Sequence, residues 1–167
     1  MTFTTRPRRD GEIDGVDHYF VRDEEFKRIL DAGELAEWAS VFGHYCGTPR
    51  KPLETAIAAG RDMLGEIDIE GARQIRGHYG RDAVTIFILP PSFGDLEIRL
   101  RGRGTEDASA VETRLRRAKE EAATFGEYDY LIINANLAES LAQLASIVEA
   151  ERLRVSRLPE GQVPWKS

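Results

Sequence analysis

The sequence is short of the features that mark secreted and membrane-spanning proteins. It has one cysteine, Cys46, in 167 residues, so no disulfide can form within the chain. No apolar run approaches the roughly 20 residues that a helix needs to cross a bilayer. No cationic start is followed by an apolar stretch of the kind found in signal peptides. We therefore expect a soluble, cytoplasmic protein without a membrane partner.

Excess positive charge is also missing. The chain has 23 lysines and arginines against 29 acidic residues, which gives a formal net charge of -6. This balance argues against broad binding to nucleic acid, because nucleic-acid phosphates attract a surplus of positive charge. Any basic site must be local. The length and the 41% hydrophobic content favour one globular unit with a substantial core.

Two kinds of catalytic site find no support in the residue pattern. His44 and His78 have no carboxylate or cysteine cluster at metal-ligand spacing, so we expect no metal site built from protein side chains. No serine or cysteine has the surroundings expected of a nucleophile oriented by histidine. The chemistry has to be sought in other groups.

The first fifty residues mix short β-prone pieces with one amphipathic helix. The helix is predicted with Asp23 as its N-cap, Phe26 on its apolar face and Gly33 as its stop. The β-prone pieces are residues 1–5, 18–21 and 37–42, with Tyr45 beyond them. This mixture predicts a small α+β region.

From residue 52 onward, apolar strands alternate with helices, which favours an α/β fold. The predicted strands are residues 63–68, 83–89 and 130–133, and the predicted helices are residues 52–60, 71–78, 92–100, 109–125 and 137–155. Strand 83–89 is almost continuously apolar, as expected of a strand covered on both faces of a parallel sheet. Ser92, with Asp95 three residues later, fits the start of a helix.

Three arginines stand close together in the segment Thr-Thr-Arg-Pro-Arg-Arg-Asp-Gly-Glu, residues 4–12. A guanidinium group can give two parallel N–H bonds to the oxygens of a phosphate, so arginines suit a phosphate-binding site. Taken alone, the segment is better explained as a solvated basic terminus.

The segment becomes distinctive together with the rest of the chain, which resembles the guanylate kinases over about residues 2–155. The matching motifs are TTRPRRDGEIDGVD (4–17), EWA (37–39), GTP (47–49), ID with GA (67–68, 71–72), ILPPS (88–92) and RLRGRGT (99–105). The resemblance implies a P-loop NTPase-like parallel sheet flanked by helices. It also implies a domain at 1–157, with a small α+β GMP-binding insert at about 11–50, a helical lid at about 93–125, and a loose tail at 158–167.

The implied activity is transfer of the γ-phosphoryl group of ATP to GMP, in purine nucleotide metabolism, with Mg²⁺ accompanying ATP. Carried over from the family, the site residues are Arg6, Arg9 and His18 for the GMP phosphate; Thr2, Glu37, Thr48 and Asp68 for guanine; Asn134 on the adenine side; and Arg99, Arg103 and Arg114 as catalytic lid arginines. His18 and Cys46 stand where the family has phosphate-binding tyrosines.

The two carboxylates suit guanine. Guanine presents adjacent N1–H and N2–H donors that adenine lacks, and an acceptor left without its donor is costly, so Glu37 and Asp68 would select the base. The alternatives are a solvent-facing strand position for Glu37 and a helix N-cap for Asp68.

The largest departure from the family is the lack of a glycine-rich P-loop, G-x-x-x-x-G-K-[ST], anywhere in the 167 residues. The resemblance also implies a first strand, between those at 63–68 and 83–89, that this sequence lacks. We therefore expect a clipped gene product or truncated chain whose ATP binding is weak. The alternative is a non-catalytic guanylate kinase-like module that binds GMP or a phosphorylated peptide. The oligomeric state stays open.

Overall fold

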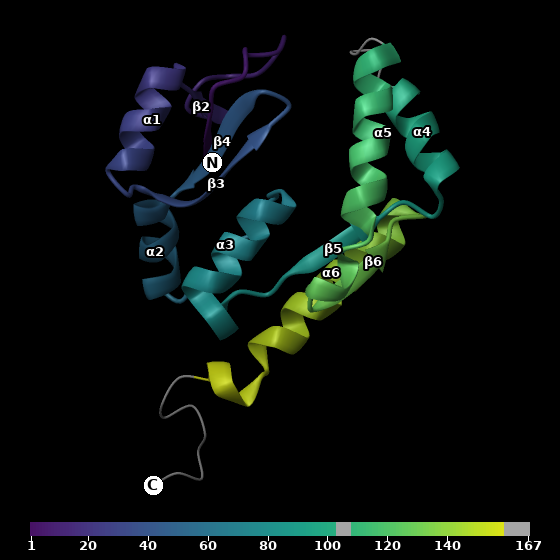
Figure 1. Cartoon of the computed structure of the whole chain (residues 1–167). Helices are drawn as coiled ribbons and strands as arrows, with labels where there is room; N and C mark the ends of the chain where they lie inside the picture. Colours follow the sequence, from purple (N-terminus) through teal and green to yellow (C-terminus); the bar gives the residue numbers. More distant parts are fainter. Residues whose placement is uncertain (103–107, 159–167) are drawn as a thin grey trace, which may run out of the picture. The chain divides into compact units, whose positions relative to one another are not determined.

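The computed structural model describes residues 1–102 and 108–158, which form two compact units, one up to Ala83 and the other from Val84. The first unit contains β1 (Thr2–Thr4), β2 (His18–Phe20), α1 (Asp23–Asp31), β3 (Leu35–Val41), β4 (His44–Pro49), α2 (Arg50–Ala58) and α3 (Ile69–Tyr79), all but β1 labelled in Figure 1. Its four strands form one sheet in the order β2-β1-β4-β3. The β1–β2 pair is parallel, and the other two pairs are antiparallel.

The two faces of this sheet differ in chemistry because successive strand residues point to opposite sides. The aromatic face carries Phe3, Tyr19, Trp38 and Tyr45. Phe26 of α1 is fully buried and stacks on Tyr45 with ring centroids 5.3 Å apart. This contact confirms the predicted apolar face of α1 and anchors the helix to the sheet. The opposite face is polar and holds most of the predicted site residues.

The N-terminus of α1 differs from the prediction. The capping position is Arg22, which makes no side-chain cap bond, and Asp23 is the first helical residue. Asp23 still favours the helix, since a negative charge in the first turn is attracted by the partial positive charge of the N-terminus. At the other end the positive φ of Gly33 confirms the predicted stop.

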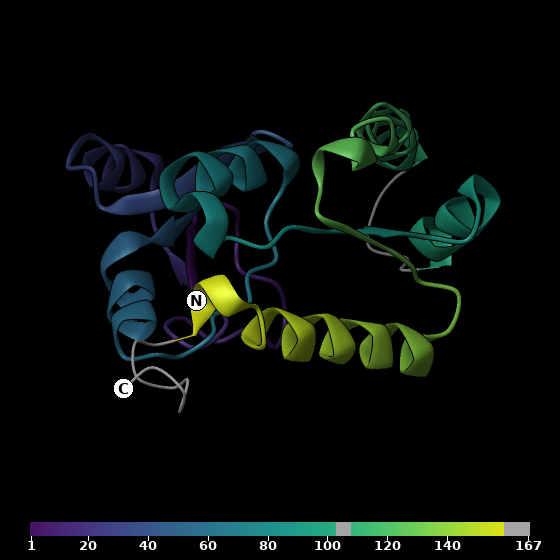
Figure 2. The same ribbon diagram turned by 90° about the horizontal axis from the view of Figure 1, so that it is seen from below.

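The second unit contains β5 (Ile86–Leu89), α4 (Phe93–Gly102), α5 (Ala108–Ala122), β6 (Tyr130–Ile133) and α6 (Leu137–Arg152). Strands β5 and β6 are parallel and pair residue for residue from Ile86 opposite Tyr130. Figure 2 shows α6, in yellow-green, running alongside these strands. The hydroxyl of Tyr130 donates to the buried Glu151 over 2.6 Å and ties the end of α6 to β6.

One predicted strand is absent, and another is shorter and more exposed than predicted. Residues 61–68 form no strand, and Leu64 is 78% exposed, because an extended segment needs a neighbour for its backbone groups and none of the described residues pairs with it. The strand predicted at 83–89 is only β5, and Ile88 within it is 55% exposed, so β5 is not covered on both faces. An apolar run indicates a strand, but its partners lie elsewhere in the chain.

The helices of the later half agree better with the sequence. The predicted helices correspond to α2 through α6 with shifts of a few residues at their ends. Ser92 accepts from the backbone N–H of Asp95 over 3.0 Å, which confirms the predicted start of α4. In α2, Ala56 is buried and the neighbouring Ile57 is exposed.

Candidate functional site

A row of polar side chains crosses all four strands of the first unit. His18 of β2 and Thr2 of β1 are opposite each other, and the His18 Nδ1 atom lies 2.8 Å from the Thr2 hydroxyl. At the other end, Thr48 of β4 faces Glu37 of β3 and donates its hydroxyl hydrogen to Glu37 Oε1 over 2.5 Å. The antiparallel register of β1 and β4 brings Thr2 and Thr48 next to each other. His18, Thr2, Thr48 and Glu37, here called the polar row, therefore form a continuous strip.

Glu37 is the most deeply buried member of the polar row, with 5% of its surface exposed. Burial raises the pKa of the Glu37 carboxyl above its ordinary value of 4.5, and the negative charge of Asp68 raises it further, while the hydrogen bond from Thr48 acts the other way. A buried acceptor of this kind favours a partner that brings N–H donors.

Asp68 has the structural role that its position before a helix allows. It is the N-cap of α3, and its Oδ1 accepts from the backbone N–H of Gly71 over 2.8 Å. This bond holds the Asp68 carboxylate next to that of Glu37, since Gly71 lies against both side chains. The two predicted guanine-binding carboxylates are thus brought together.

The predicted phosphate-binding arginines follow β1. The guanidinium of Arg6 makes a two-point ion pair with Glu12, including a bond from Nη1 to Oε2 of 2.8 Å, and lies over the ring of Phe20. Arg9 contributes its backbone N–H to the same Glu12 oxygen over 2.7 Å, and its side chain is exposed. The Glu12 carboxylate therefore binds both the Arg6 guanidinium and the Arg9 backbone.

The role of Glu12 was not anticipated. The hydrogen bond from Arg6, then that from the Arg9 backbone, lowers the pKa of Glu12 from 4.5 to about 2. The signal in the sequence is Asp10-Gly11, a turn pair that folds the chain back so that Glu12 can reach Arg6. Gly11 has a φ of 86°, a conformation that glycine adopts without strain.

A hollow of about 790 Å³ opens beside Arg6. Its lining includes three further arginines, Arg8, Arg22 and Arg28, together with Glu24 and Glu25. The surroundings of Arg6 are therefore basic on balance, which favours an anionic ligand.

Cys46 lies on the same face as the polar row, two residues before Thr48 in β4. Its thiol is 3.2 Å from the hydroxyl of Thr4, which is itself fully buried. A thiol is a weak donor, so this position holds a compact side chain in place of a hydroxyl.

The residues predicted for the ATP side lie in the second unit. Arg99 of α4 donates from Nη2 to the backbone carbonyl of Asn134 over 2.8 Å, so these two residues are in contact. The Asn134 side chain accepts from Ser140 over 3.3 Å. Arg114 is on α5, and Arg103 lies outside the described residues.

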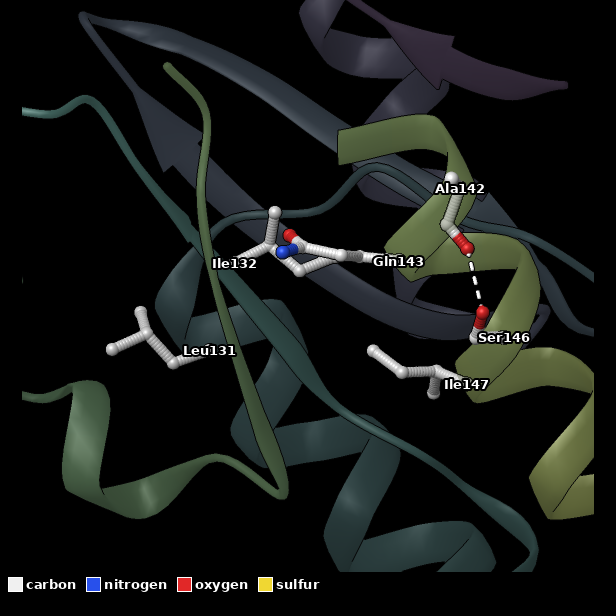
Figure 3. Close-up of a pocket in the computed structure, with 6 residues that line it drawn as sticks. All are labelled: Leu131, Ile132, Ala142, Gln143, Ser146 and Ile147. Atoms are coloured by element: carbon white, nitrogen blue, oxygen red, sulfur yellow. Dashed lines mark hydrogen bonds between the residues drawn. The ribbon is translucent and has the colours of Figure 1, made fainter. Parts of the chain in front are cut away.

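Another hollow, of about 430 Å³, lies between β6 and α6 (Figure 3). Gln143 points from α6 towards Ile132. The hydroxyl of Ser146 donates a hydrogen bond to the backbone carbonyl of Ala142 over 2.9 Å. The residues that line this hollow carry no charged group, and none of them is a predicted site residue. We do not assign it a chemical role.

Within the described ranges, no three histidine, cysteine or carboxylate side chains gather in a way that could hold a metal ion. The side chains in these ranges therefore do not fit a Mg²⁺ site built by the protein alone. No helix in the same ranges has the length and apolar character to span a membrane.

Comparison with known proteins identifies relatives over most of the chain. A sequence model described as guanylate kinase matches residues 1–151. A guanylate kinase of Mesorhizobium japonicum is 46% identical over 159 residues, covering 95% of this chain and 73% of the relative. A guanylate kinase of Cereibacter sphaeroides is 46% identical over 161 residues, covering 96% and 76%. The crystal structure of guanylate kinase from Anaplasma phagocytophilum superposes with a TM-score of 0.82 at 37% identity, covering 93% of this chain and 76% of that one.

Proposed function

Because the chain belongs to the guanylate kinase family of phosphotransferases, we propose that its residues 1–83 bind GMP, the acceptor in ATP-dependent phosphoryl transfer. The observation that carries the proposal is the polar row, which runs from a buried carboxylate at Glu37 to the imidazole at His18. The two ends of a nucleoside monophosphate match the two ends of this row. The base carries N–H donors for a carboxylate, and the phosphate at the other end is an anion.

At the base end, Glu37 and Asp68 accept from the N1–H and N2–H groups of guanine, and Thr2 and Thr48 line the approach. Adenine offers no donors at these two positions, so the buried carboxylate of Glu37 would be left without a partner. The hydrogen bond from Thr48 holds Glu37 ready for the base.

At the phosphate end, Arg6, Arg9 and His18 take the GMP phosphate. Glu12 occupies the Arg6 guanidinium in the absence of ligand, and the phosphate joins or replaces it there. A phosphate suits this position because its oxygens resemble those of the Glu12 carboxylate in spacing and charge, and the Arg6 guanidinium can bind either group through two N–H bonds.

On the ATP side, we assign Arg99, Arg103 and Arg114 to the polyphosphate and Asn134 to the adenine. Positioned guanidinium groups neutralise the charge that spreads over the oxygens of a transferring phosphoryl group. When Mg²⁺ is bound, it comes with the ATP phosphates. The 167 residues contain no G-x-x-x-x-G-K-[ST] motif, so we expect this chain to bind GMP without appreciable turnover.

A titration of the full chain with GMP in a calorimeter tests the proposal. Arg6→Ala should weaken GMP binding by about 10- to 100-fold, the loss expected for hydrogen bonds to a charged group. The matched control is Arg61→Ala, which removes an exposed arginine of the same unit that does not line the hollow beside Arg6 and should change the affinity by less than about twofold. Equal losses in the two variants would mean that the phosphate binds elsewhere.

A coupled assay for GDP formation from ATP and GMP tests the second part. We expect GMP binding with negligible product. Robust GDP formation would contradict the weak ATP site, whereas the lack of any GMP binding would contradict the site itself.

The second candidate is a non-catalytic module for a phosphorylated peptide. The hollow beside Arg6 favours it, since Arg8, Arg22 and Arg28 continue the basic surface beyond the polar row. A phosphoserine peptide that displaces GMP and loses affinity in Arg22→Ala would support this candidate, and GMP binding that is unaffected by such a peptide would exclude it.

A further inference from the structure

Gly71 occupies a position where its residue type needs an explanation. It lies in the first turn of α3, and its φ is not among the positive values that favour glycine. Glycine is less favourable than alanine inside a helix, because it loses more backbone freedom on folding. The backbone conformation alone would therefore favour a larger residue here.

The space beside Gly71 is taken by the side chain of Glu37. A Cβ atom on residue 71 would lie 2.5 Å from Glu37 Oε2, 3.2 Å from Glu37 Cδ and 3.4 Å from Asp68 Oδ1. The first distance is far shorter than a van der Waals contact. The Glu37 carboxylate thus lies where the side chain of any other residue at 71 would begin.

The same glycine joins the two carboxylates of the base end. Its backbone N–H is bonded to Asp68, and its open side accepts Glu37, whose other oxygen is held by Thr48. Each carboxylate therefore takes its place from contacts that converge on Gly71. Because hydrogen-bond strength falls steeply with distance and angle, a shift of one acceptor would weaken its bond to the base.

We propose that Gly71 is a positioning residue for guanine selection, because the lack of a side chain leaves room for the Glu37 carboxylate beside Asp68. This inference rests on the proposed function and deepens it. Gly71 does not have to touch the base. It acts through Glu37, and the base for which it prepares the site is a purine with adjacent ring and exocyclic N–H donors.

The chain offers a matched control in the same helix. Gly77 also lies in α3, but a Cβ atom there would meet nothing within 4 Å. Gly77→Ala should therefore leave nucleotide binding unchanged and raise the melting temperature through its helix propensity. Gly71→Ala brings the same gain in propensity but forces Glu37 to move.

The experiment compares GMP with IMP, which lacks the exocyclic amino group, by calorimetry on the full chain. In Gly71→Ala we expect GMP affinity to fall about tenfold or more and IMP affinity to fall less, so that the preference for GMP shrinks. The displaced group is the far end of a flexible side chain, so the variant should fold, which a melting curve checks. Unchanged GMP and IMP affinities would overturn the inference while leaving the proposed function intact.

A double-variant cycle separates positioning from a general structural effect. With Glu37→Ala in place there is no carboxylate to displace, so adding Gly71→Ala should cause no further loss of GMP affinity. A further loss as large as in the wild-type background would overturn the inference. Glu37→Asp gives a test that leaves the helix untouched, since it withdraws the carboxylate by one methylene and should also reduce the preference for GMP over IMP; an unchanged preference would contradict the inference.

If the unmodified chain binds neither nucleotide, the proposed function fails. If it binds GMP and Gly71→Ala behaves as Gly77→Ala, only the role of Gly71 fails.

Discussion

The ionised carboxylate of Glu37 is held in an electrostatically unfavourable position. The carboxylate lies 5% exposed beside a second carboxylate, and both burial and the charge of Asp68 disfavour its ionised form. An apo protein gains nothing from this arrangement at neutral pH. A ligand with two N–H donors would compensate the carboxylate, so the strain fits a binding site better than a structural position.

This gives a prediction about stability and pH. The folded-state pKa of Glu37 is raised, so its contribution to stability is present below about pH 4.5 and lost as the pH rises through the raised pKa. Glu37→Gln keeps an oxygen that can accept from Thr48 and removes the charge. We expect a higher free energy of unfolding for the variant at pH 7, and a difference that shrinks as the pH falls towards 4.5.

Urea unfolding at several pH values between 4 and 7 measures this difference. The control is Glu34→Gln, an exposed glutamate three residues earlier, which should stay within about 0.5 kcal/mol of the wild type throughout. A difference between Glu37→Gln and wild type that does not vary with pH would contradict the prediction.

At the scale of elements, α3 covers one edge of the sheet. β3 is one of its two edge strands, so the outward backbone groups of β3 have no strand to pair with. The Gln74 side chain accepts from the Trp38 N–H over 3.0 Å and donates to the Trp38 carbonyl over 2.7 Å. A His78 ring nitrogen lies 2.9 Å from the carbonyl of Ala36. Side chains of α3 thus make hydrogen bonds to the edge of β3 that a neighbouring strand would otherwise provide.

Gln74→Ala should therefore destabilise the first unit by about 1–3 kcal/mol, because it leaves a backbone donor and a backbone acceptor of Trp38 without partners. Gln143→Ala, at an exposed position of α6, is the matched control and should change the free energy of unfolding by less than about 0.5 kcal/mol. Denaturant unfolding compares the two. Similar small effects would show that water satisfies the edge of β3 as well as Gln74 does.

At the scale of the whole molecule, the proposed ligands divide between the two units. Every residue assigned to GMP lies before Ala83, and Arg99, Arg114 and Asn134 lie after Val84. A ligand at 100 times its dissociation constant stabilises the part that binds it by about 2.7 kcal/mol. GMP should therefore act on one unit more than on the other.

Hydrogen–deuterium exchange read by segment measures this. Saturating GMP should slow exchange in β1, β3, β4 and the start of α3, and leave β5, β6 and α6 nearly unchanged. The Arg6→Ala variant at the same GMP concentration should show a weaker effect. Protection that is confined to β5, β6 and α6 would contradict the division.

Much of the local structure follows from local patterns. The strand at residues 130–133, the apolar face of α1 and the stop at Gly33 could be predicted because periodicity and glycine chemistry act over a few residues. The strand predicted at 63–68 failed for the opposite reason, since a strand exists only with a partner. The contact of Glu12 with Arg6 and the fit of Glu37 against Gly71 were likewise not predicted, although all four residues belong to the motifs that the sequence shares with the family.

The amino-acid sequence by itself determined the family of this protein, the residue types at its predicted site and the approximate course of its helices. Only the tertiary structure decided that His18, Thr2, Thr48 and Glu37 form one row, and that Glu37 and Asp68 converge on Gly71. The physical reason is that composition and periodicity act within a segment. Strand order, register and the packing of α3 on β3 depend on contacts between residues tens of positions apart.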